Sequence, residues 1–269
     1  MEIDKGRLNG IIAMAQLLEA LKAAGVDYEL ASFTGGSAAN AIPTGAKATI
    51  VTDEGGKTAV KSAAAALQAE LTAKYTGIEE DVTILVADAE MPAQVVSAAD
   101  SDAALRYVLG IIDGVHTMSQ YVDGLVESSS NLGLFQMDAE GVKATSYTRS
   151  SDPERFLEIE AQMTALAEEC GLAWNTTKTA DAWPYNPDNK LLPLVREIYQ
   201  KLNGEPINEV SVHAGLECGT FAILNPKLNM ISIGPDLTDV HSPAETLYLK
   251  SIPKTWHLLE GVLQSLPQA

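Results

Sequence analysis

Basic residues, cysteine and histidine are all scarce in this chain of 269 residues. It has 18 Lys and Arg against 36 Asp and Glu, which gives a formal net charge of −18 and a pI of about 4.5. A surface this acidic repels phosphate groups, so we expect no nucleic-acid partner and no binding to anionic membranes. The two cysteines, Cys170 and Cys218, are too few for a disulfide framework or a thiolate metal site.

Long apolar runs are also missing. No run reaches the roughly 18 residues that a membrane-spanning helix needs, and the first residues lack the pattern of a signal peptide. We therefore expect a cytoplasmic protein with reduced thiols. The hydrophobic content of 46% is ordinary for a globular chain with a filled core.

The first two thirds of the chain predict strands next to short turns, with helices between them. The turn Asp138-Ala139-Glu140-Gly141 predicts a hairpin, and Asp152-Pro153 is a typical helix start. This order predicts an α+β domain over residues 4–177, an antiparallel sheet covered by helices. The expected helices are 8–24, 57–75, 100–115 and 153–169, and the expected strands are 28–33, 46–52, 82–86, 128–137 and 142–149.

Elements alternate more strictly after residue 178. Short apolar strands between helices predict an α/β arrangement with a parallel sheet. About 90 residues with two clear strands are few for a sheet covered on both faces, so we expect residues 178–269 to form an incomplete α/β segment of a larger domain. The expected helices are 189–202, 216–224 and 251–266, and the expected strands are 210–213 and 230–233.

Two polar clusters in this second part follow expected strands. His213 to Gly219 runs into an expected helix, where ligands of open α/β sheets bind, although a tight turn with a core histidine explains it equally well. Cys218 beside His213 lacks an evident acid partner for nucleophilic chemistry. The second cluster contains His241, which is either a zinc ligand or a structural histidine, and no HExxH or paired-cysteine motif accompanies it.

Asn40 and Arg149 stand at the ends of expected strands in the first part. A guanidinium binds a carboxylate in bidentate fashion, but a surface ion pair with one of the many acids is the alternative for Arg149. His116 and His257 fall on expected helices without polar neighbours, and we interpret both as structural.

Several short runs, in one order along nearly the whole chain, resemble the C-terminal part of bacterial aminoacyl-histidine dipeptidases. These Xaa-His dipeptidases, which cleave carnosine, are zinc metallopeptidases of the group that includes aminoacylase and carboxypeptidase G. The matching runs are Phe33-Thr34-Gly35-Gly36-Ser37 with Asn40-Ala41-Ile42-Pro43, Gly124 to Gly133, Arg149-Ser150-Ser151, Asn186-Pro187-Asp188, His213 to Gly219, Ile231 to Pro235 and His241-Ser242-Pro243.

The resemblance implies roles for both parts of the chain. Residues 4–177 would be the lid that interrupts the catalytic domain and contributes to dimers, and residues 178–269 the last segment of that catalytic domain. By the same resemblance His241 is a zinc ligand, and Asn40 and Arg149 hold the substrate, the arginine through the terminal carboxylate. Gly215 matches a backbone contact in the substrate pocket.

The remaining zinc ligands, the bridging Asp and the general-base Glu of the family have no counterpart in this chain. Ala39 and Thr44 also replace arginines that family members usually carry. We therefore expect part of a cytosolic zinc dipeptidase that hydrolyses Xaa-His dipeptides and forms a homodimer through its lid. The chain alone would be inactive and hold no stoichiometric zinc, because a two-zinc centre needs more than one imidazole. The alternative is a non-catalytic module for dimerisation or ligand binding.

Overall fold

The computed structural model describes residues 3–177, 183–209, 217–240 and 244–266. The chain divides into two compact units, Met1–Thr177 and Lys178–Ala269, and each is described by itself. Within the described ranges no helix has both the length and the apolar character needed to cross a membrane.

Unit 1 contains a five-stranded sheet in which every strand pair is antiparallel. The long strand β4 lies at its centre. Along one side β4 pairs first with β3 and then with β1, and along the other side it pairs with β5 over nearly its whole length. β2 continues the sheet beyond β1. The strands are β1 Tyr28–Gly35, β2 Ala46–Thr52, β3 Gly114–Met118, β4 Val126–Asp138 and β5 Gly141–Ser150.

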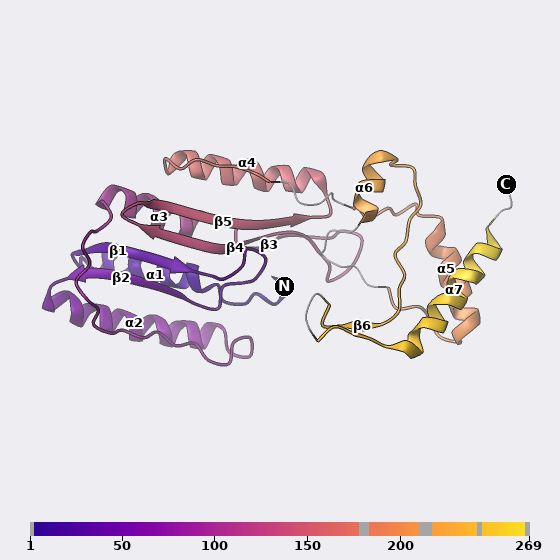
Figure 1. Ribbon diagram of the computed structural model, residues 1–269, viewed down its shortest axis with the longest axis horizontal. Helices are drawn as coiled ribbons and strands as arrows, with labels where there is room; N and C mark the ends of the chain where they lie inside the picture. Colours follow the sequence, from indigo (N-terminus) through magenta and orange to yellow (C-terminus); the bar gives the residue numbers. More distant parts are fainter. Residues whose placement is uncertain (1–2, 178–182, 210–216, 241–243, 267–269) are drawn as a thin grey trace. The chain divides into compact units, whose positions relative to one another are not determined.

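Helices cover one face of this sheet, and Figure 1 shows α1 and α3 behind the strands. The core of unit 1 joins α1, α3 and α4 to residues of β1 and β4, including Phe33 and Phe135, whose ring centroids lie 4.6 Å apart. α2 packs beside α1. The helices are α1 Gly10–Ala23, α2 Glu54–Lys74, α3 Ala98–Gly110 and α4 Pro153–Glu169, after a short 3-10 turn at Ile3–Lys5.

Local sequence explains where these helices begin. Asn9, Asp53, Ser97 and Asp152 each stand at an N-cap, and each side chain accepts a hydrogen bond from a backbone N–H of the first turn. The α+β prediction for this part, an antiparallel sheet with helices, is confirmed.

Two details of the prediction for unit 1 are wrong. Residues 82–86 form no strand, because the backbone N–H of Ile84 bonds to the side chain of Gln68 on α2 and not to a neighbouring strand. The helix expected over residues 100–115 ends at Gly110, so His116 lies on β3 and not on a helix.

Unit 2 is built around the packing of α5 against α7. Their shared core consists of Val195, Ile198, Leu258 and Val262. The elements of this unit are α5 Leu191–Asn203, α6 Glu217–Leu224, β6 Leu237–Thr238, β7 Thr246–Leu247, a 3-10 turn at Leu249–Ser251 and α7 Ile252–Ser265. The described strands, β6 and β7, pair with each other in antiparallel fashion.

The strand expected at residues 230–233 is absent from the structure. The carbonyl oxygen of Met230 accepts a hydrogen bond from the side chain of Asn189, 2.6 Å away. A side chain, and not a neighbouring strand, is therefore the partner of this backbone group. The strand expected at residues 210–213 lies outside the described residues.

Candidate functional site

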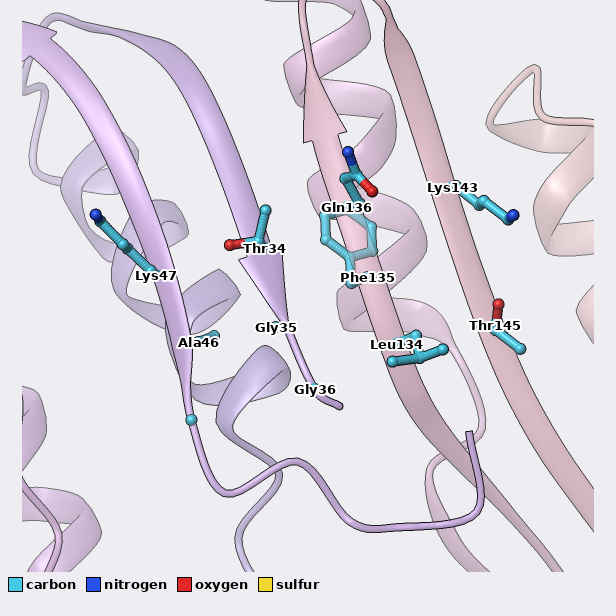
Figure 2. A pocket seen from close by; sticks show the side chains of 11 residues that line it. Thr34, Gly35, Gly36, Ala46, Lys47, Leu134, Phe135, Gln136, Lys143 and Thr145 are labelled. Carbon is cyan, nitrogen blue, oxygen red and sulfur yellow. The ribbon is translucent and has the colours of Figure 1, made fainter. Parts of the chain in front are cut away.

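The face of the unit 1 sheet that turns away from the helices carries polar side chains. Lys47, Thr34, Gln136 and Lys143 lie directly opposite one another on β2, β1, β4 and β5, so they form one row across this open face. Figure 2 shows these four side chains around a shallow hollow of about 560 Å³ that Leu134 and Thr145 also line. The polar and basic side chains of this row therefore form a solvent-exposed surface that could bind a polar ligand.

Asn40 lies in the loop between β1 and β2 and is exposed. That loop lies against β4: the side-chain amide of Asn131 donates hydrogen bonds to the carbonyl oxygens of Ala39 and Ala41, both at 2.9 Å. A Cβ at Gly133 would lie 2.3 Å from the carbonyl oxygen of Ala39, so only glycine permits this close approach.

Arg149 lies near the end of β5, opposite Ser129 of β4, and is half-buried. Its guanidinium stands over the ring of Tyr147, 5.0 Å from the centroid, which orients the cation. Tyr147 pairs with Asn131, the residue that holds the Asn40 loop. Asn131 and Arg149 therefore lie at neighbouring positions on one face of the sheet. The structure thus brings Asn40 and Arg149 into the same region.

A buried polar network lies next to this region. Between the segments that pair with β3 and β1, the backbone of Leu132 on β4 has no strand partner on that side. The carboxylate of Asp113 accepts the N–H of Leu132 at 2.8 Å, and the side chain of Asn9 donates to the carbonyl of Leu132 at 3.1 Å and to Asp113 at 2.9 Å. Burial raises the pKa of Asp113, and the hydrogen bonds that its carboxylate accepts from Leu132 and Asn9 oppose the rise.

The other predicted site residues lie in unit 2. His213, Gly215 and His241 are outside the described residues, so their predicted roles are untested. Cys218 stands in the first turn of α6 and is half-buried. His257 lies on α7 as expected, exposed, with Glu260 3.9 Å away. Across the described ranges, no group of three or more His, Cys, Asp and Glu side chains is arranged to hold a metal ion.

Sequence reasoning assigned no role to Asn131, Asn9 or Asp113. Asn131 belongs to one of the matching runs, and the sequence signal was an unbroken polar stretch, Ser128 to Asn131, at the start of an expected strand. The partners of Asp113 and Asn9 are far apart in the chain, and no local pattern reveals such a network.

Comparison with known proteins finds similarity to dipeptidases. A cytosol non-specific dipeptidase of Escherichia coli (strain K12) is 29% identical over 242 residues, which cover 90% of this chain and 50% of that protein. The crystal structure of an aminoacylhistidine dipeptidase from Vibrio alginolyticus matches with a TM-score of 0.91 and 27% identity over 98% of this chain and 54% of that one. No family model matches the chain.

The antiparallel sheet with its helices is therefore part of a peptidase-type fold. The particular resemblance that the sequence motifs indicated, to the aminoacyl-histidine dipeptidases, is confirmed. The chain spans about half the length of the relatives that it matches.

Proposed function

We propose that this chain is the C-terminal portion of a cytoplasmic zinc dipeptidase that hydrolyses Xaa-His dipeptides. Unit 1 serves as the lid, with Arg149 binding the terminal carboxylate of the substrate and Asn40 holding the same molecule. The observation that carries this proposal is the placement of both residues in one region of the open face, which is supported by Asn131. The two dipeptidase relatives support the reaction class.

Unit 2 supplies a backbone contact at Gly215 and one zinc ligand, His241, in this proposal. The described residues contain no group of three or more His, Cys, Asp and Glu side chains that could hold zinc. In this proposal the other zinc ligands would come from the rest of the enzyme. We expect the chain alone to hydrolyse no Xaa-His dipeptide and to keep no stoichiometric zinc pair after dialysis. Zinc-dependent hydrolysis by the purified chain would contradict this expectation.

The surface of α7 supports a role for unit 2 as a segment of a larger domain. Leu258 and Val262 bury one side of this helix against α5. A second stripe at helical spacing, made by Ile252, Trp256 and Leu263, is exposed, with Trp256 at 62% and Leu263 at 60%. A helix with two apolar faces normally packs on both, so the second face is suited to cover further parts of a catalytic domain.

Arg149 gives the direct test of substrate binding. Titration calorimetry would compare glycyl-histidine with its C-terminal amide, which lacks the carboxylate. We expect the acid to bind more tightly than the amide, and Arg149→Ala to abolish this difference. The control Arg155→Ala removes a cation of α4 that pairs with Glu158, and it should keep the difference. Equal binding of acid and amide by the unchanged chain would refute the assignment.

A homodimer through unit 1 is a further part of the proposal, and a non-catalytic dimerisation or ligand-binding module is its alternative. β2, β3 and β5 each pair with a single strand, and such edge strands present backbone groups with which a second copy can pair. Light scattering at micromolar concentrations should show a dimer. A monomer throughout that range would count against both the dimer and the dimerisation module.

A further inference from the structure

Asn131 is a buried polar side chain next to the proposed substrate site. It is 1% exposed and lies in the middle of β4. Its neighbour Leu132 is fully buried in the core, and successive side chains of a strand point to opposite faces, so Asn131 belongs to the open face. Its two hydrogen bonds end on the carbonyls directly before and after Asn40.

The orientation of this amide is determined by its partners. Both neighbours are carbonyl oxygens, which only accept, so the NH₂ group must face them. The amide oxygen then has no hydrogen-bond partner among the described residues. Buried acceptors without a donor are rare and unfavourable, so an apolar residue would serve the sheet alone better. The two hydrogen bonds to the loop therefore explain why an amide stands at position 131.

Strand register places this anchor beside the arginine. Asn131 pairs with Tyr147 and Ser129 pairs with Arg149, so Asn131 and Arg149 are diagonal neighbours on one face. Such neighbours lie roughly 7–8 Å apart. The loop that Asn131 holds therefore approaches the sheet within reach of the same small molecule that contacts Arg149.

We infer that Asn131 is a positioning residue: its two hydrogen bonds fix the loop so that Asn40 faces a substrate bound at Arg149. This inference rests on the proposed function of Asn40 and Arg149 in holding a dipeptide. Asn131 acts through Asn40, because its own side chain is buried beneath the loop. Without the amide, the loop would occupy the binding geometry only part of the time, and apparent affinity falls by that fraction.

The test measures binding of glycyl-histidine to the full chain by NMR titration. Asn131→Ser removes both hydrogen bonds, and if the loop then keeps its geometry about a tenth of the time, binding weakens about tenfold. Asn40→Ala in the Asn131→Ser background should cost almost nothing more, because two residues acting through one contact are not additive. The matched control Ser146→Ala alters a buried hydroxyl of β5 opposite Leu132 and should leave binding unchanged.

A second measurement separates positioning from general damage. In Asn131→Ser the preference for glycyl-histidine over its amide should remain, because Arg149 still binds the carboxylate, whereas a disrupted sheet would lose this preference as well. If Asn131→Ser does not fold, Asn131→Leu keeps a side chain of similar size without a hydrogen-bond donor and replaces it in the test. Unchanged binding in a folded Asn131 variant, or full additivity with Asn40→Ala, would overturn the inference.

Failure of the proposed function has a different signature. In that case the unchanged chain would not distinguish acid from amide, whatever stands at position 131. The role of Asn131 as an anchor could then still be measured by hydrogen exchange of the loop amides, which should accelerate in Asn131→Ser. Exchange that stays slow would refute the anchor itself.

Discussion

Asp113 accepts the backbone N–H of Leu132 where β4 has no neighbouring strand on that side. Two substitutions of Asp113 separate the contribution of its hydrogen bonds to stability from that of its charge. Its oxygen Oδ1 accepts from both Leu132 and Asn9. Asp113→Ala leaves the N–H of Leu132 buried without a partner and removes the bond from Asn9, at an expected cost of about 2–4 kcal/mol in the free energy of unfolding. Asp113→Asn keeps an oxygen for both donors and removes the charge.

The raised pKa determines the sign for Asp113→Asn. Burial outweighs the two hydrogen bonds, so the folded chain favours the neutral acid more than water does. The asparagine variant should therefore match or exceed the unchanged chain at pH 7, within about 1 kcal/mol. Because the folded pKa lies above 3.8, the folded state binds more protons, and the contribution of Asp113 to stability is full below 3.8 and is lost as the pH rises through the folded pKa.

The stability of unit 1 is measured by urea unfolding that is monitored through hydrogen exchange of the β4 amides. These amides report on unit 1 and not on unit 2. The unchanged chain should gain stability relative to Asp113→Asn when the pH falls from 7 towards 4. A loss in Asp113→Asn as large as that in Asp113→Ala, or an advantage of aspartate that grows at higher pH, would refute the reasoning.

Three further predictions test the fold. Phe33→Ala should lower the free energy of unfolding by about 3–5 kcal/mol, because the ring is fully buried, and urea titration measures it. Gly133→Ala should displace the neighbouring loop, since the new Cβ would meet a carbonyl oxygen at 2.3 Å, whereas Gly45→Ala meets nothing and should leave loop exchange unchanged. Leu263→Glu should change stability by less than about 0.5 kcal/mol while reducing binding of an apolar dye, and Leu258→Glu, at a 4% exposed position, should unfold unit 2.

Sequence reasoning succeeded where the signal is local. The hairpin of β4 and β5 follows from alternating side chains around a short turn that ends at Gly141, and α4 follows from Asp152 and Pro153 at its start. These features depend on residues close together in the chain, so the pattern contains the information.

It failed where a strand needs a distant partner. Residues 82–86 are apolar enough for a strand, but Leu85 is 87% exposed and no described strand pairs with the segment. Residues 230–233 fail for the same reason, because part of their backbone bonds to a side chain of a distant residue. Apolar character and β propensity are local properties, whereas pairing depends on the whole fold.

The candidate site shows the same division between local pattern and tertiary structure. Motifs indicated Asn40 and Arg149 separately, but their proximity follows from the register of β4 with β5 and from the anchor at Asn131. The open face carries cations although the chain as a whole is acidic. Lys47, Lys143 and Arg149 lie on it, in a chain of net charge −18, and Glu29 of β1 lies on the same face. Salt screens the interaction between charges that are more than about 10 Å apart. A carboxylate bound at this face therefore interacts with nearby cations more strongly than with distant acids. The net charge of the chain alone does not exclude an anionic ligand.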